Sequence, residues 1–131
     1  HMGRPDVTKD PDGPEFGLFL RFLRENPNVW TKVSCPERLS VSGPRALHGE
    51  QHAYTDVVPF ARRVVEEFPD RVLWGTDWPH PNLKDHMPDD GLLVDFIPQI
   101  AVTEEQQRKL LVDNPRRLYW ADASPTTPEG A

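Results

Sequence analysis

The sequence predicts an α/β fold in which short parallel strands alternate with helices. A segment with helical periodicity at 15–26 precedes a strand-like segment at 29–34, and the same order returns at 56–68 and 71–75. Strands that are joined by helical crossovers of about a dozen residues run parallel. In such sheets, ligands bind where the strands end at their carboxyl termini.

The first predicted helix, 15–26, has apolar residues at i, i+3, i+4 and i+7. Asp12 or Gly13 is expected to cap it, and the step from Asn26 to Pro27 is expected to end it. The strand that follows, VWTKVS, is rich in β-branched and aromatic residues.

The second predicted helix, 56–68, has the same apolar period, with Asp56 as its expected N-cap and Pro59 in its first turn. The apolar run RVLWG at 71–75 is the next strand. Further along, the helical pattern GLLVDFIPQIA contains Pro98, which is expected to kink or end it.

The last helical segment opens with Thr103 and Gln106 at the spacing of a capping box. The step from Asn114 to Pro115 is expected to close it. Residues 1–122 are thus expected to form the folded domain, and residues 123–131 a disordered tail.

Length and composition limit the possible functions. The chain has 131 residues, which suits one domain but is about half of what a complete α/β barrel of roughly 250 residues needs. A net charge of −6 argues against a nucleic-acid or anionic-membrane surface. A single cysteine, Cys35, excludes an intrachain disulfide and a multi-cysteine zinc site, and it fits a cytoplasmic protein. No apolar run approaches the ~20 residues of a membrane span.

Asp77 is the first candidate for chemistry, because it follows the strand 71–75 directly. An aspartate at such a place is often a helix cap or turn former, but Trp78 and Pro79 follow it and no strong helical pattern does. Its tryptophan neighbours can partly desolvate the carboxylate, which favours the alternative role of a general base.

Three further residues lie in loops that follow the two strands. His80 and Asn82 share a rigid, proline-rich loop with Asp77, although a loop histidine is commonly a surface residue. Arg38 follows the strand 29–34; it is either a surface arginine paired with Glu37 or a guanidinium that binds a carboxylate.

The other histidines and the cysteine are expected to have no catalytic role. His48, His52 and His86 lie in polar segments and are expected to face solvent. Cys35 has no histidine near it in sequence and is interpreted as a buried structural thiol. One aspartate and scattered histidines do not indicate a zinc site, so no metal or other cofactor is expected.

The segment RVLWGTDWPHPN, preceded by NVWTKVSCPERLS and followed by NPRRLYW, resembles the amidohydrolase superfamily. More narrowly, it is similar to the metal-independent lactonases that hydrolyse 2-pyrone-4,6-dicarboxylate in bacterial lignin catabolism. The resemblance covers about residues 1–120 and implies the C-terminal portion of a (β/α)8 TIM barrel.

The resemblance also implies roles for particular residues. Asp77 matches the aspartate that acts as general base on the attacking water, and Arg38 matches an arginine that grips a substrate carboxylate. His80 and Asn82 match loop residues near the charged end of the substrate. The opening HMGRP matches a family segment in which the histidine, here His1, helps to polarise the lactone carbonyl; the other origin of a leading His-Met is a cloning scar.

The sequence departs from the family pattern in one large respect. The family carries a His-x-His pair and further arginines and a tyrosine in its N-terminal half, and no His-x-His occurs in this chain. We therefore expect hydrolysis of a cyclic dicarboxylate ester by a complete barrel and little or no activity from this chain alone. The alternatives are a non-catalytic half-barrel that self-associates through open sheet edges, and a metal-dependent amidohydrolase or decarboxylase.

Overall fold

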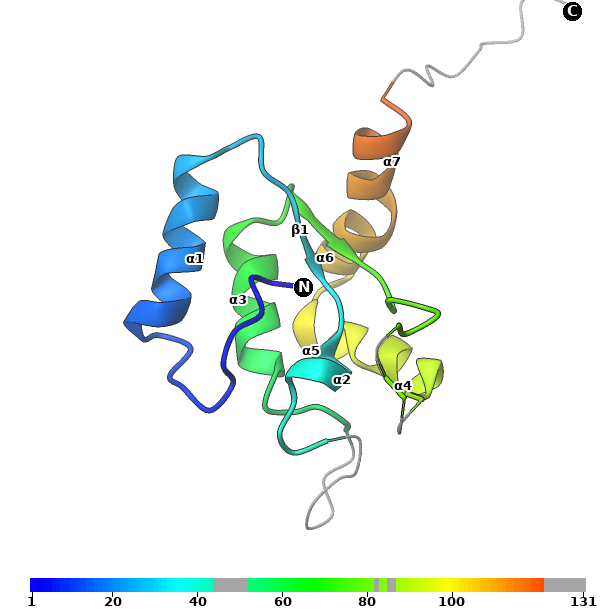
Figure 1. The fold of residues 1–131 in the computed structure, drawn as a ribbon. Helices are drawn as coiled ribbons and strands as arrows, with labels where there is room; N and C mark the ends of the chain where they lie inside the picture. The colour runs from blue at the N-terminus through cyan, green and yellow to red at the C-terminus, as the bar shows by residue number, and fades with distance from the viewer. Residues whose placement is uncertain (44–51, 82, 85–86, 122–131) are drawn as a thin grey trace, which may run out of the picture.

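The computed structural model describes residues 1–43, 52–81, 83–84 and 87–121 (Figure 1). It contains two parallel strands, β1 and β2, with helices before, between and after them. In chain order the elements are α1 (Pro14–Glu25), β1 (Thr31–Val33), α2 (Pro36–Leu39), α3 (Val58–Glu67), β2 (Val72–Trp74), α4 (Asp90–Asp95), α5 (Ile97–Ile100), α6 (Glu104–Arg108), η1 (Lys109–Asp113) and α7 (Asn114–Tyr119). The predicted α/β class with parallel strands is confirmed.

The sheet places the amino-terminal residues beside β1. Lys32 and Leu73 are partners in the parallel register of β1 and β2. Thr31 donates its backbone N–H toward β2, to the Arg71 carbonyl at 3.1 Å, whereas the Lys32 carbonyl accepts from the Met2 N–H at 3.0 Å. Because backbone groups of successive strand residues point to opposite edges, His1 and Met2 lie along the edge of β1 that faces away from β2.

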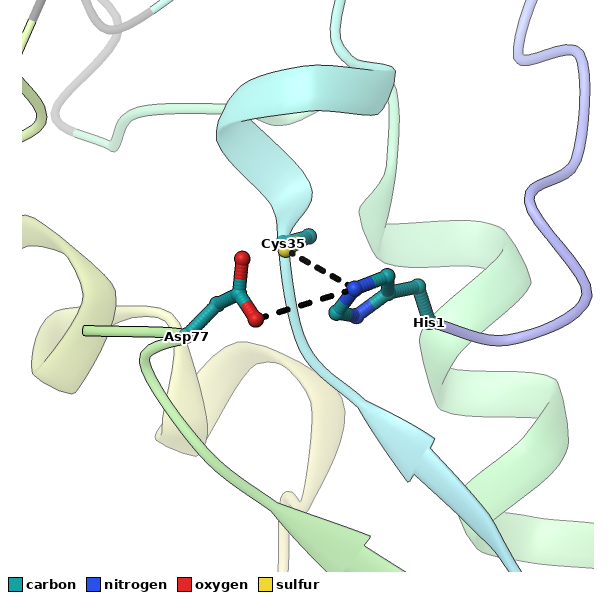
Figure 2. Close-up of side chains that lie close together, drawn as sticks. All are labelled: His1, Cys35 and Asp77. Carbon is teal, nitrogen blue, oxygen red and sulfur yellow. Dashed lines mark hydrogen bonds and ion pairs between the residues drawn. The ribbon is translucent and has the colours of Figure 1, made fainter. Parts of the chain in front are cut away.

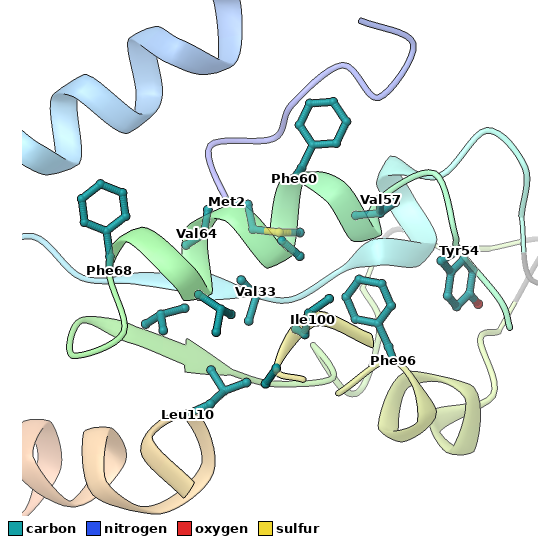
Figure 3. Packing of buried hydrophobic residues seen from close by; sticks show 14 of the residues in the cluster. Met2, Val33, Tyr54, Val57, Phe60, Val64, Phe68, Phe96, Ile100 and Leu110 are labelled. Atoms are coloured by element: carbon teal, nitrogen blue, oxygen red, sulfur yellow. The ribbon is translucent and has the colours of Figure 1, made fainter. Parts of the chain in front are cut away.

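The apolar periods predicted from the sequence form the core (Figure 3). On α1 the buried residues are Phe16, Leu20 and Leu23. Phe60, on α3, meets Phe16 in an edge-to-face ring contact with 5.0 Å between centroids. Helix α3 joins this cluster to Val33 of β1, so the helix between the strands covers one face of the sheet.

Asp56 is not the N-cap of the second helix, as the sequence had predicted. Val57 occupies the N-cap of α3 and no side chain caps that end. The Asp56 carboxylate instead accepts four hydrogen bonds, from the hydroxyls of Ser40 and Ser42 and the backbone N–H groups of Val41 and Ser42. The prediction failed because a long loop returns to the carboxylate, which local spacing does not reveal.

The other helix-terminus predictions are mostly confirmed. Gly13, rather than Asp12, is the N-cap of α1. Pro98 does break the next helical pattern, since α4 ends at Asp95 and α5 begins at Ile97. Thr103 and Gln106 form the predicted capping box of α6.

Pro115 does not end the last helix, which corrects the sequence prediction. The chain first forms a π-helical turn, η1, in which the Asn114 N–H bonds to the Lys109 carbonyl, and then continues as α7. This wider turn accommodates a proline, which lacks an N–H and crowds the preceding turn. The buried Asn114 side chain donates to the carbonyls of Pro69 and Val72 at 2.7 and 2.8 Å, which ties the helix to the start of β2.

Two expectations concern the chain as a whole. No helix within the described ranges combines the length and the apolar character that a membrane crossing requires. The predicted tail, 123–131, lies outside the described residues, so the proposed boundary at residue 122 stays a prediction.

Asp56→Ala should lower the free energy of unfolding by about 2 kcal/mol, because several charge-assisted hydrogen bonds are lost together. Burial raises the pKa of Asp56, but the hydrogen bonds from Ser40, Ser42 and Val41 outweigh it and hold the pKa below its usual value. The contribution is therefore complete above the unfolded-state pKa, near 4, and is lost as the pH falls through the folded-state pKa.

Urea denaturation at pH 7 and at pH 3 measures this effect. The exposed Asp95 provides the control, and Asp95→Ala should change stability by less than about 0.5 kcal/mol at both pH values. Equal losses for the two variants at pH 7 would contradict the assignment.

Candidate active site

Asp77 lies just beyond the carboxyl end of β2, and Cys35 lies just beyond that of β1. Both residues adopt the left-handed backbone conformation, with φ of 65° at Asp77 and 60° at Cys35. A non-glycine residue in this region costs on the order of 1–2 kcal/mol, and such positions cluster at functional sites. The two turns therefore mark one end of the sheet as the place to look for chemistry.

Arg38 and Asp77 form an ion pair at this end of the sheet. Arg38 Nη2 is 3.0 Å from Asp77 Oδ2. The exposed fraction is 18% for the Arg38 side chain and 23% for that of Asp77. Arg38 also donates to the Pro81 carbonyl, which fixes the guanidinium over the loop that carries Asp77. The predicted proximity of the two residues is confirmed; Asp77 caps no helix, since the next one, α4, is capped by Asp89.

His1 adds an imidazole to this group, and Figure 2 shows its ring directed toward Asp77 and Cys35. Its Nε2 atom is 3.7 Å from Asp77 Oδ1 and 3.5 Å from Cys35 Sγ, and its Nδ1 is 2.7 Å from Ser34 Oγ. The hydroxyl contact orients the ring so that Nε2 faces the carboxylate. Three of the residues selected from the sequence, His1, Arg38 and Asp77, are thus brought together.

Cys35 is buried, as predicted, but it belongs to this group rather than to a purely structural core. Burial raises the pKa of the Cys35 thiol to about 12, and the nearby carboxylates of Asp77 and Glu37 act in the same direction. The thiol is consequently protonated at neutral pH. Its place directly after a strand, like that of Asp77, was the sequence signal that could have located it.

His80 is placed differently from a substrate-binding residue. Its side chain is fully buried, with Nδ1 3.4 Å from Glu37 Oε1 and Nε2 2.9 Å from Asp90 Oδ1. This geometry does not support the expected contact between His80 and a substrate, because both ring nitrogens face carboxylates of the chain itself. Burial raises the pKa of the Glu37 carboxyl, and the residue's own backbone N–H together with His80 offsets only part of that rise.

His52 is exposed, as predicted. Asn82, His48 and His86 lie outside the described residues, so the substrate-binding role of Asn82 stays a prediction.

A residue that sequence reasoning missed lies beside His1. A hollow of about 320 Å³ is lined by His1, Lys32 of β1, Leu73 of β2 and Tyr119 of α7, among others. Lys32 is exposed there and places a positive charge on the same hollow as His1. A lysine in the middle of a three-residue strand was the available signal.

Comparison with known proteins decides the family. The family model described as amidohydrolase matches residues 1–120. The chain belongs to the amidohydrolase family. The resemblance seen in the sequence is thereby confirmed.

Relatives of this amidohydrolase chain include named lactone hydrolases. It is 81% identical to the 2-pyrone-4,6-dicarboxylate hydrolase of Comamonas testosteroni, over 93% of the chain and 40% of that protein. It is 43% identical to the 4-sulfomuconolactone hydrolase of Hydrogenophaga intermedia, over 91% of the chain and 37% of that protein. The chain therefore spans about 40% of the length of these relatives.

A solved structure supports the fold of the amidohydrolase chain. The apo crystal structure of a protein from Agrobacterium tumefaciens superposes with a TM-score of 0.68 at 28% identity. The match covers 92% of this chain and 40% of that protein.

A metal ion could be held at this site of the amidohydrolase chain. His1, Cys35 and Asp77 each offer a ligand atom, and these atoms lie within 4.8 Å of one another. Three protein ligands with an open fourth position are typical of a catalytic zinc centre. Cys35 would have to lose its proton to bind, which works against metal binding at neutral pH. The expectation that the protein uses no metal stays a prediction.

The Cys35 thiol of the folded amidohydrolase chain should react with iodoacetamide at pH 8 roughly 10³-fold more slowly than in the urea-unfolded chain. The reason is the smaller thiolate fraction, since an unfolded cysteine has a pKa near 8.5. Mass spectrometry of alkylation over time measures both rates, and the single cysteine makes the result unambiguous. A folded-state rate equal to the unfolded one would indicate a thiolate–imidazolium pair with His1 instead.

Proposed function

We propose that residues 1–131 are the C-terminal portion of a (β/α)8-barrel hydrolase that opens the lactone ring of 2-pyrone-4,6-dicarboxylate. The observation that carries this proposal is the position of the Asp77 carboxylate, at a strand's carboxyl end between the His1 imidazole and the Arg38 guanidinium. The activities for which the two relatives are named, both lactone hydrolyses, support the same reaction class. We place the reaction in bacterial catabolism of lignin-derived aromatic acids.

The barrel is supported by the strand arrangement. The His1–Met2 segment, β1 and β2 follow one another across the sheet in chain order, with α1 and α3 as crossovers. That order and the coverage of the sheet by helices on one face are features of TIM barrels. Catalytic side chains in these barrels lie at the carboxyl ends of the strands, where Asp77 and Arg38 are found.

The proposed chemistry is a single hydrolysis. Asp77 takes a proton from water, and the hydroxide formed attacks the carbonyl carbon of the ring ester. The imidazole of His1 stabilises the negative charge that develops on the carbonyl oxygen, while the guanidinium of Arg38 holds one substrate carboxylate. Collapse breaks the ring C–O bond, and the proton held by Asp77 passes to the departing enolate oxygen. The product is an open-chain enol acid, which converts to its keto form.

The cationic groups at the site suit a substrate with two carboxylates. Arg38 keeps 18% of its side chain exposed, so a substrate carboxylate can replace Asp77 as its partner. This exchange would free the Asp77 carboxylate to accept a proton at the moment when the substrate is bound. Lys32, exposed beside His1, is placed to attract the second carboxylate.

A second candidate function is non-catalytic self-association. Among the described residues, large apolar side chains are exposed near the C-terminal helix: Leu111, Val112, Leu118, Tyr119 and Trp120. A second copy of the chain could cover them, and a dimer in size-exclusion chromatography would favour this alternative. In the proposed barrel, the N-terminal part of a longer protein covers them.

Asp77→Asn should lower kcat for 2-pyrone-4,6-dicarboxylate by about 10³-fold, because the amide cannot accept the water proton. The test uses a complemented enzyme, in which the part of the Comamonas testosteroni hydrolase that precedes the matched region is joined to residues 1–131. Loss of the substrate's ultraviolet absorbance measures the rate, and circular dichroism checks the fold.

The control for this experiment is Asp95→Asn, an identical exchange at an exposed residue of α4, which should leave kcat unchanged. Activity that survives Asp77→Asn would refute the general-base assignment. An inactive parent hybrid with native-like circular dichroism would count against the proposed function itself.

Removal of metal should leave the activity of the complemented enzyme unchanged. The proposed reaction uses only the Asp77 base and cationic side chains, and the Cys35 thiol is protonated at neutral pH. Dialysis against a strong chelator, followed by rate measurement and elemental analysis, tests this. Stoichiometric zinc, with activity lost on chelation and restored by zinc, would favour the metal-dependent alternative supported by the His1, Cys35 and Asp77 cluster.

A further inference from the structure

Glu37 is buried in a way that the proposed chemistry does not use. Its side chain is fully inaccessible, and among the described residues neither its carboxylate oxygens nor the facing His80 Nδ1 has a hydrogen-bond partner in another residue. The nearest titratable contact is His80 Nδ1, 3.4 Å from Oε1. Burying a carboxylate with so little compensation is costly, which indicates that its position serves another purpose.

The Glu37–His80 contact is more deeply buried than the Arg38–Asp77 ion pair. Glu37 and Arg38 are neighbours on α2, and one reaches the buried side of the loop 77–81 while the other reaches its exposed side. Both contacts therefore join α2 to the same loop. A loop held at two places on the same helix turn has little freedom to shift relative to that helix.

His80 transmits this restraint to Asp77 through the backbone. The His80 N–H donates to the Asp77 carbonyl at 2.7 Å, which closes a tight turn that begins at Asp77. The backbone φ is 65° at Asp77 and 56° at His80. Because few conformations are open to non-glycine residues at positive φ, the backbone of this turn has little freedom to move. On its other side the His80 ring is fixed by Asp90, 2.9 Å from Nε2.

We propose that Glu37, acting through His80, is a positioning residue that sets the place of the Asp77 carboxylate relative to Arg38. The inference rests on the proposed function, because it assigns Glu37 and His80 to the alignment of that same site. His80 then acts indirectly, by holding the turn that presents Asp77. This role replaces the direct contact with substrate that was expected from the sequence. Misalignment of a base by about 1 Å can cost as much as 10²-fold in rate.

Kinetics of the complemented enzyme test this coupling. Glu37→Gln and His80→Gln keep the buried volume nearly constant, so the fold should survive. Each should lower kcat about 10-fold while KM changes less than about twofold, because the base shifts and the substrate's cationic partners do not. The double variant should lose no more than His80→Gln alone, since that exchange already breaks the contact with Glu37 in addition to the one with Asp90.

Matched exchanges at exposed sites serve as controls, namely Glu66→Gln and His52→Gln, and neither should change kcat. Unchanged kcat in both buried variants would overturn the proposal, as would losses that multiply in the double variant. A rise in KM with constant kcat would return His80 to substrate binding.

A second measurement needs no activity and so separates this inference from the proposed function. In residues 1–131, His80→Gln leaves Cys35, Glu37 and Asp77 unchanged in sequence but releases the turn that presents Asp77. Iodoacetamide should then modify Cys35 at least about 10-fold faster than in the parent chain, because the thiol becomes more accessible. An unchanged rate, with His52→Gln as the control, would show that the contact does not hold the turn.

Discussion

The ion pair between Arg38 and Asp77 is the contact on which the candidate site depends. It joins the segments that follow β1 and β2, and parallel strands bring these segments to the same end of the sheet. A partly buried carboxylate needs a cationic partner, and here the partner is itself anchored by the Pro81 carbonyl. Because both side chains keep some exposed surface, the pair is held in place and still reachable from solvent.

The backbone around this pair is unusual for the same reason. Cys35 and Asp77 both take the left-handed conformation shortly after a strand ends. At each of these residues the backbone turns sharply across the end of the sheet. The fold tolerates this cost because the turns are held from several sides: His1 contacts both residues, and Glu37 meets His80 behind them. The site is thus built from two sharp turns that are fixed by their contacts with each other.

Much of the fold could be predicted from the sequence, because it depends on local spacing. Apolar residues at helical intervals located α1 and α3, and Thr103 with Gln106 located the start of α6. The errors arose where a distant segment supplied the partner. Asp56 satisfies a loop that begins with Ser40 instead of capping its own helix. Pro115 remains inside a helix because a π turn precedes it.

For the site, the sequence by itself determined which chemical groups are available: Arg38 and Asp77 were identified from residue type and from their place after predicted strands, and His1 from the resemblance of HMGRP to a family segment. Only the tertiary structure decided their partners. It placed Cys35 beside His1, and it turned His80 away from the site into contact with Glu37. The physical reason is that periodicity and capping act over a few residues, whereas ion pairs and burial depend on the crossing of segments that are far apart in the chain.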